Sequence, residues 1–429
     1  MANTEGLERA VAEISARREE LFAELATLVS FATPSPPARN TLAAQAWVAE
    51  TLAGLGFEVA EVPHYDGDVN VAGTLRGSDP DTHHSLIVNG HVDVAEVGDD
   101  AHWSYPPFAL TKGSDGRLYG RGVADMKGGI AASLFAIRML REHGVGLRGD
   151  LQLHSVTGEE VGEAGTRAVV ESGHVADFAV VVDTSDLHVQ GQGGVITGWI
   201  TIESPETFHD GMRSRMIHAG GGVHGASAIE KMVKVITALQ ELERHWAVTK
   251  RHPDFPAGTD TINPAVIEGG RHAAFIADRC ALWVTVHFYP DETFEQVVEE
   301  IESHVLAAAA ADPWLRDHPP SFRWGGRSML DERGEIFPAL DVDRSHPAVA
   351  TLTGAYAEQT GAQAIVDMSP SVTDGGWFGH ARIPAAIFGP GELAHAHAVD
   401  ESVDPDQLVT FAQVMARFIA TWCNTPREP

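Results

Sequence analysis

Cysteine and positive charge are both scarce in this chain. Its two cysteines, Cys280 and Cys423, stand far apart in 429 residues. They cannot form a disulfide framework, so we expect a reducing compartment, the cytoplasm. Lysine and arginine number 30 against 60 aspartate and glutamate residues, which gives a net charge of −30. Nucleic acid and anionic membrane surfaces are therefore not expected as partners, because both would repel the protein.

Long apolar segments and processing signals are also missing. No apolar run approaches the ~18 residues of a membrane span, and the longest runs, such as residues 178–182, have the length of a strand. The first ten residues (MANTEGLERA) contain no basic region followed by an apolar one, so we expect no signal peptide. The motifs HExxH and GxSxG are absent, which argues against a zincin and against a serine hydrolase with a nucleophile elbow.

Helices alternate with strands along most of the chain. Helical periodicity covers residues 7–30, 41–55 and 126–142, and short β-rich runs such as SLIVNG and FAVVVD stand between and after these segments. This alternation predicts an α/β domain with a largely buried sheet.

The alternation is interrupted from about residue 194. The order there is β-α-β-β-α-β, which predicts a ferredoxin-like α+β domain inserted into the α/β domain. We therefore expect the first domain at residues 1–193 and 333–429, and the insert at residues 194–332.

Two segments place polar side chains at a strand end and at a helix start. NGHVDV puts His91 and Asp93 two residues apart on a strand, so both point to the same side. GRGVADMKGG puts Asp125 just before a helix, after glycines that let a ligand approach the backbone closely. Each segment alone also fits a plainer interpretation, a surface strand end for the first and a helix cap for the second.

Two further segments add carboxylates and histidines. In TGEEVGEAGT, Glu159 and Glu160 follow a strand and can divide metal binding and proton transfer, although such pairs are more often solvated. Asp183 ends an apolar strand, which places it at the carboxyl edge where open α/β sheets bind ligands. The loop GPGELAHAHAVDE contains His395 and His397, and either can be a ligand.

In combination, the segments GHVDV, GRGVADMKGG, TGEEVGEAGT and GPGELAHAHAVDE resemble one family. It is the zinc-dependent aminoacylase, acetylornithine deacetylase and succinyl-diaminopimelate desuccinylase family (metallopeptidase family 20), which also contains dipeptidases and carboxypeptidases. The resemblance spans about residues 20–420. It implies an α/β catalytic domain like that of zinc exopeptidases, with a mixed sheet and helices on both faces. It also implies an inserted lid through which two copies form a homodimer.

The resemblance also implies a role for each polar residue. His91 and Asp183 would hold one divalent ion, and Glu160 and His397 would hold a second. Asp125 would bridge the two ions. Asp93 would orient His91, and Glu159 would be the general base. Two ions lower the pKa of a shared water and polarise the scissile carbonyl, while the base moves the proton to the leaving nitrogen. Zinc suits these ligands, and Co²⁺ or Mn²⁺ can substitute.

The insert resembles the family lid, in which one histidine reaches the active site of the partner subunit and stabilises the oxyanion. The segment HAGGGVHGASAI assigns this role to His218, with His209 and His224 as alternatives. Asn263 matches a family substrate contact. His287 stands where many members carry an arginine that clamps a substrate carboxylate, and histidine is not an equivalent clamp.

Thr373 and Asp374 in SPSVTDGGWFG match two further family residues near the substrate, although the usual preceding glycines are missing. The sequence thus predicts a two-metal hydrolase that cleaves an amide bond of a small N-acylated amino compound, with Glu159 as base. A dipeptidase or carboxypeptidase with the same centre is the alternative. A binding protein on an inactive scaffold would have lost a ligand or the base, and this chain retains them all.

Overall fold

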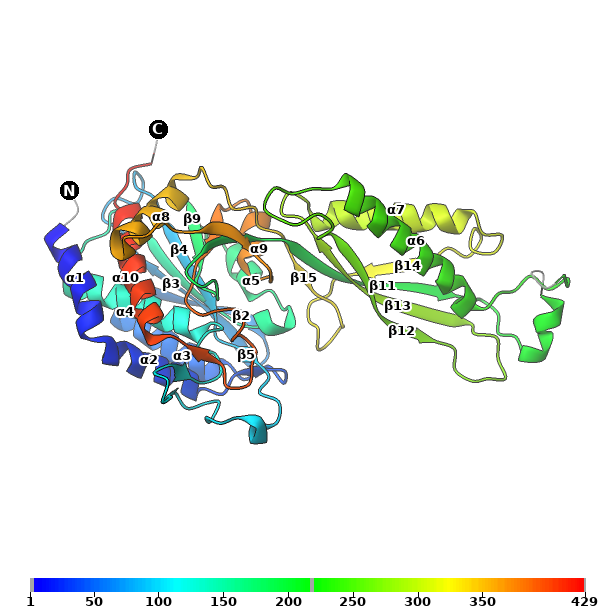
Figure 1. Ribbon diagram of the computed structural model, residues 1–429, viewed down its shortest axis with the longest axis horizontal. Coiled ribbons are helices and arrows are strands. Elements are labelled where there is room, and N and C mark those ends of the chain that lie inside the picture. The colour runs from blue at the N-terminus through cyan, green and yellow to red at the C-terminus, as the bar shows by residue number, and fades with distance from the viewer. Residues whose placement is uncertain (1–3, 217–219, 428–429) are drawn as a thin grey trace. The chain divides into compact units, whose positions relative to one another are not determined.

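The chain forms two compact units in the computed structural model, which describes residues 4–216 and 220–427 (Figure 1). The large unit comprises Met1–Gln192 and Leu340–Pro429, and the inserted unit comprises Gly193–Ala339. The second boundary lies later than the predicted 332/333, because β15 (Ile336–Phe337) pairs with the first strand of the inserted unit.

The large unit is built on a mixed sheet of eight strands in the order β16-β10-β17-β9-β4-β8-β3-β2. The neighbours β17, β9, β4 and β8 run parallel, whereas β10 against β17 and β8-β3-β2 are antiparallel. The strands are β2 (Glu58–Tyr65), β3 (Asp68–Leu75), β4 (Leu86–His91), β8 (Leu151–Val156), β9 (Phe178–Val181), β10 (Val189–Gln192), β16 (Val366–Ser369) and β17 (Ala385–Ile387). Every residue of β4, β8 and β9 is buried, as expected for central strands with helices on both faces.

Helices cover both faces of this sheet, as predicted. The larger layer shares one hydrophobic core with the sheet and contains α1 (Thr4–Ala16), α2 (Arg18–Ser30), α3 (Leu42–Gly54), α4 (Lys127–Glu142), α8 (Pro347–Thr360) and α10 (Pro405–Trp422). On the other face, α5 (Gly165–Glu171) buries Val169 against Ala72 and Val156 and contacts α9 (Gly375–His380). Across the described residues, no helix combines the length and apolar character needed to cross a membrane.

Short strands add a second, smaller sheet that the sequence did not predict. It contains β6 (Thr111–Lys112), β7 (Leu118–Tyr119) and β18 (Ser402–Val403) in the order β18-β7-β6. Two-residue strands have no readable periodicity, which is why the pattern did not reveal them. The antiparallel pairing of β7 with β18 brings the GRGVADMKGG segment next to the end of the AHAHAVDE loop.

The inserted unit has the predicted ferredoxin-like order. Its elements are β11 (Gly194–Glu203), α6 (Ala228–Thr249), β12 (Thr261–Gly269), β13 (Arg279–Phe288), α7 (Phe294–Ala310) and β14 (Ser321–Trp324), and the sheet order is β12-β13-β11-β14. Leu282, Val284 and Val286 alternate along β13 and are buried with α6 and α7 in one core. The other face of the sheet carries a mixture of aromatic, hydroxyl and charged side chains.

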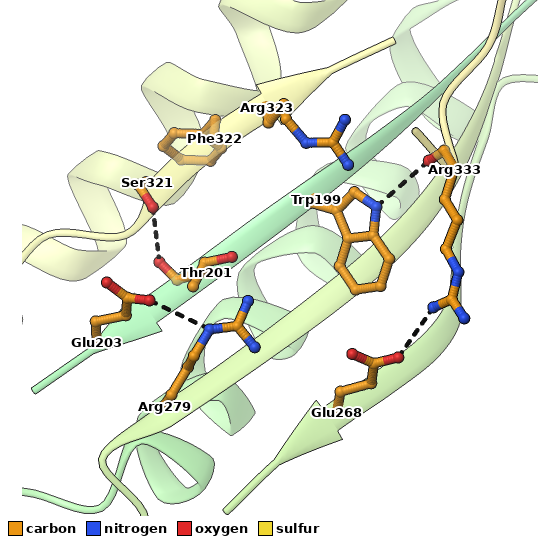
Figure 2. Close-up of a pocket in the computed structure, with 9 residues that line it drawn as sticks. All are labelled: Trp199, Thr201, Glu203, Glu268, Arg279, Ser321, Phe322, Arg323 and Arg333. Carbon is orange, nitrogen blue, oxygen red and sulfur yellow. Dashed lines mark hydrogen bonds and ion pairs between the residues drawn. The ribbon is translucent and has the colours of Figure 1, made fainter. Parts of the chain in front are cut away.

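Figure 2 shows this face of the inserted unit. Trp199 on β11 stacks on Trp283 of β13, with ring centroids 5.8 Å apart. An ion pair of 3.0 Å joins Arg333 to Glu268 on β12, and the Arg333 carbonyl accepts a hydrogen bond from Trp199. The polar side chains on this face therefore pair largely with one another.

Candidate metal centre

Parallel strands deliver the predicted ligands to one edge of the large sheet. β9, β4 and β8 are parallel neighbours, so their carboxyl ends meet. His91 is the last residue of β4, Asp183 follows β9, and the loop after β8 carries Glu159 and Glu160. Asp125 approaches the same edge from the start of α4. Residues from four distant segments thus converge because the strands are parallel.

Two potential metal-binding clusters form there, and they share Asp125. His91, Asp125 and Asp183 form one cluster, and Asp125, Glu160 and His397 form the other, with the ligand atoms of each within 4.8 Å of one another. Asp125 Oδ1 lies 3.2 Å from His91 Nε2, and Asp125 Oδ2 lies 3.2 Å from His397 Nε2. The Asp125 carboxylate thus has one oxygen near the histidine of each cluster, an arrangement that suits a ligand shared by two ions.

Glycine makes this convergence possible at two positions. A Cβ on Gly129 would lie 2.0 Å from the Val182 carbonyl oxygen, so only glycine lets the first turn of α4 approach the end of β9. Gly158 has a φ of 82°, a left-handed conformation that favours glycine, and it turns the chain directly before Glu159.

A backbone hydrogen bond sets the tautomer of His91. His91 Nδ1 lies 2.9 Å from the Asp93 carbonyl oxygen, which can only accept, so Nδ1 carries the proton. The Nε2 lone pair is then directed at the cluster and is available to a metal ion. The carboxylate of Asp93 also lies near the ring, with Oδ1 3.7 Å from His91 Nδ1, and it accepts from the backbone N–H groups of Gly158 (2.9 Å) and Glu160 (3.1 Å).

The site contains more buried negative charge than its histidines neutralise. Burial raises the pKa of Glu159 well above its usual value, that of Glu160 to about 7 and that of Asp183 to about 8, and neighbouring carboxylates contribute in each case. Hydrogen bonds to Asp125 and Glu160 raise the pKa of His397 to about 11. Such mutual perturbation is typical of functional sites.

Two buried polar atoms test whether metal ions fit this arrangement. His91 Nε2 and Glu160 Oε1 are both buried and have no hydrogen-bond partner. Unsatisfied buried nitrogen and carboxylate atoms are costly unless something else satisfies them. Because each belongs to a cluster of three potential ligands, divalent cations fit the residues present.

A cavity of about 110 Å³ opens beside the clusters. Besides the acidic residues and His397, it is lined by Thr184, Ser369, Ser371, Val372, Thr373, Leu393 and Ala396. In the part of the chain that the structure describes, no lysine or arginine lines this cavity. The cavity therefore offers hydroxyl groups and small apolar surfaces to a substrate, and no permanent cation.

The large unit also contains the predicted residues Thr373 and Asp374. The Thr373 backbone N–H donates to Gln192, and Thr373 lines the cavity. Asp374 is buried, and its Oδ2 accepts a 2.7 Å hydrogen bond from Thr166. His395 belongs to neither cluster of described residues, so the structure brings His397 rather than its neighbour to the carboxylates.

The remaining predicted residues belong to the inserted unit. Asn263 on β12 and His287 on β13 are both exposed on their strands. His218 lies outside the described residues, and the alternatives His209 and His224 are exposed. The role of each in substrate or transition-state binding stays a prediction.

Three buried charged residues near the clusters were not singled out from the sequence. Arg121 Nη1 lies 2.8 Å from Glu401 Oε2, and both side chains are almost completely buried. Lys127 is fully buried, its Nζ donates to the Phe31 carbonyl, and burial lowers its pKa to about 7. All three stand inside the quoted motifs, and charge among glycines and apolar residues was the signal that could have revealed them.

Comparisons with known proteins identify the family. Residues 87–421 match the family described as Peptidase family M20/M25/M40. The chain is 55% identical over 416 residues to N-formyl-4-amino-5-aminomethyl-2-methylpyrimidine deformylase of Bacillus subtilis (strain 168), covering 97% of each chain. It is 28% identical to acetylornithine deacetylase of Proteus mirabilis, covering 87% of each.

A solved structure shows the same fold. It is the Bacillus subtilis YXEP protein, described as a dinuclear metal binding peptidase from the M20 family. The TM-score is 0.65 at 15% identity, covering 95% of this chain and 98% of the other.

The chain belongs to the peptidase M20 family. It is a hydrolase of the deacylase type, which cleaves the amide bond of a small N-acylated compound, as the sequence predicted.

The shared position of Asp125 generates a prediction about metal stoichiometry. We expect Asp125→Asn to lose both ions and His397→Ala to lose one, because Asp125 belongs to both clusters and His397 to one. Metal content per chain after dialysis would be measured by mass spectrometry. His395→Ala is the matched control, with the content of the wild-type protein. Two tightly bound ions in Asp125→Asn would contradict the bridging role.

Proposed function

We propose that this protein is a deformylase of an N-formyl aminopyrimidine, releasing formate and the free amine. The observation that carries this proposal is the 55% identity, over 97% of both chains, to the Bacillus subtilis enzyme with that name. A second relative, from Halalkalibacterium halodurans, carries the same name at 53% identity.

The walls of the cavity support a substrate without a carboxylate. An N-acyl amino acid or a dipeptide carries a carboxylate that needs a cationic partner when it is desolvated. No lysine or arginine lines the described cavity. A volume of about 110 Å³ beside the clusters also suits a small acyl group. These features favour deformylation over the dipeptidase alternative.

The five residues of the two clusters are the proposed ligands of two divalent ions: His91, Asp125, Glu160, Asp183 and His397. Imidazole nitrogens with carboxylate oxygens suit zinc, and Co²⁺ or Mn²⁺ accepts the same set. The fold relative described as a dinuclear metal binding peptidase supports two ions. Bound there, the ions supply the positive charge that lowers the pKa of a water and polarises the amide carbonyl.

Glu159 is the proposed general base. It lines the cavity, its Oε2 lies 3.8 Å from His91 Nε2, and burial raises its pKa well above the usual value. A carboxylate of raised proton affinity takes a proton from the attacking water more readily. Returning that proton to the leaving nitrogen lets the C–N bond break with a neutral amine as product. His218 of the partner subunit is the proposed donor to the oxyanion.

Exposed apolar side chains on the inserted unit support a homodimer. Ile229 and Val233 on α6 are 41% and 58% exposed, and Val266 and Ile267 on β12 are 36% and 54% exposed. Among the described residues, β12 has only β13 as a strand partner, so its outer edge offers unpaired backbone groups. An edge strand beside an apolar helix face is suited to pairing with the same surface of a second copy.

Both cysteines support a reducing compartment, the cytoplasm. Cys280 and Cys423 are buried and free, and burial raises the pKa of each thiol. Neither is therefore poised to form a disulfide.

The substrate proposal is tested by product release. Protein loaded with Zn²⁺, Co²⁺ or Mn²⁺ should release formate from N-formyl-4-amino-5-aminomethyl-2-methylpyrimidine at a higher kcat/KM than it hydrolyses N-acetylornithine or dipeptides. Formate would be measured with a coupled dehydrogenase, and amines by derivatisation. Hydrolysis of dipeptides without formate release would support the dipeptidase alternative instead.

The base assignment is tested with Glu159→Gln, which keeps the size of the side chain and removes its basicity. We expect kcat to fall by about 10²–10⁴-fold, with two ions still bound, because Glu159 belongs to neither ligand cluster. Metal content and kcat would be measured on the same preparation. Turnover within a few-fold of the wild-type value would rule out Glu159 as the base.

The dimer is tested with the double variant Val233→Glu and Ile267→Lys. Charges at these positions should convert the dimer into a monomer in light scattering coupled to gel filtration, and activity should fall if His218 acts across the interface. Leu306→Glu, at a residue 39% exposed on α7, is the matched control. A wild-type protein that is monomeric at micromolar concentration would overturn the proposal.

A further inference from the structure

The pairing of β7 with β18 brings together a buried ion pair next to the two clusters of potential metal ligands. Tyr119 pairs with Ser402, and the Gly120 N–H donates to the Glu401 carbonyl. The neighbouring side chains, Arg121 and Glu401, then meet at 2.8 Å with 2% and 0% exposure. Two buried charges of opposite sign are stable together, and each is costly without the other.

Glu401 holds the backbone that presents the bridging carboxylate. One of its oxygens, Oε2, accepts from Arg121, and the other, Oε1, accepts from the N–H groups of Ala124 (2.8 Å) and Asp125 (3.1 Å). Both oxygens of the carboxylate are thus occupied, and one of the two bonds to Oε1 comes from the backbone N–H of Asp125 itself. The position of Asp125 therefore depends on Glu401.

Arg121 holds the loop that presents the histidine ligand. Its Nη2 donates to the carbonyl oxygens of Glu96 (3.0 Å) and His397 (3.4 Å). The His397 side chain is 59% exposed, so packing does not fix its imidazole. The residue also has a φ of 59°, a left-handed conformation that is costly for a side chain other than glycine. External contacts such as the bond from Arg121 must hold this backbone in place.

We propose that Arg121 and Glu401 are positioning residues, which set the spacing between Asp125 and His397 and thereby the affinity of the cluster that these two share with Glu160. This inference rests on the proposed metal centre. The pair holds the backbone of two residues of this cluster, His397 and Asp125, but of only one residue of the other, Asp125, because His91 and Asp183 are delivered by β4 and β9.

The test uses Glu401→Gln and Arg121→Lys. Glutamine keeps the size of the side chain but removes the charge opposite Arg121, and lysine keeps the charge but cannot bridge Glu401 and two carbonyls at once. We expect each variant to bind the ion of the His397 cluster roughly 10–100-fold more weakly, the usual effect of losing a group that orients metal ligands. The other ion should weaken less, because only Asp125 connects its cluster to the pair. Calorimetric titration of the metal-free protein with Zn²⁺ would resolve the two ions. Excess Zn²⁺ should restore kcat with KM unchanged.

Arg417→Lys provides the matched control. Arg417 is 9% exposed, lies on α10 of the same unit, and is paired with Glu8 and Glu358, away from the clusters. The Arg417→Lys variant should have a lower melting temperature than the wild-type protein and should bind both ions with unchanged affinity. If Glu401→Gln melts lower and still binds both ions with the affinity of the wild-type protein, the pair is merely structural and the proposal is overturned.

The result for the wild-type protein separates this inference from the proposed function. Failure of the wild-type protein to bind two ions overturns the metal centre, and the positioning role falls with it. Two ions in the wild-type protein and an equal loss of both in Glu401→Gln overturn only the selective role of the pair. If Glu401→Gln does not fold, Arg121→Lys decides, since it retains a buried positive charge beside Glu401.

Discussion

Electrostatic repulsion among buried carboxylates is the constraint on which the rest of this structure depends. Asp125, Glu159, Glu160 and Asp183 are brought to one edge of a buried sheet, where desolvation disfavours their charged forms. Only Asp125 keeps a low pKa, because two histidines contact it and outweigh the effect of burial. The other carboxylates have raised pKa values and therefore a high proton affinity, which suits the proposed roles of this site in binding metal ions and moving a proton.

The surrounding structure holds these groups in place through backbone hydrogen bonds. Asp93 and Glu401 are buried carboxylates that play matching parts on two sides of the centre. Asp93 accepts from N–H groups in the loop after β8, and Glu401 accepts from N–H groups in the segment before α4. Arg121 pairs with Glu401, and the charges of Asp93 and Glu401 partly offset the effect of burial, which lowers the pKa of Lys127 to about 7. The backbone that carries the proposed metal ligands is thus held by Asp93 and Glu401, which are not themselves proposed ligands.

Much of this arrangement could be predicted from the sequence, because strong periodicity and motif text are local properties. The large α/β unit, the ferredoxin-like insert and the carboxyl-edge position of His91 and Asp183 followed from strand order and strand ends. Asp93 was expected to orient His91, and that role stays a prediction. Its carbonyl oxygen accepts from the imidazole, its Oδ1 lies 3.7 Å from His91 Nδ1, and its carboxylate also holds the loop after β8. A period of two along a strand cannot distinguish side chain from backbone.

By itself, the sequence determined the longer helices and strands, the chemical types of the proposed ligands and the family, because each is encoded within a few tens of residues. The tertiary structure alone decided which of His395 and His397 reaches the carboxylates, and which buried charges support them. Those choices depend on β7 and β18, two short strands almost 300 residues apart in the chain. Pairing between such distant segments leaves no local pattern, because it is selected by the packing of the whole unit.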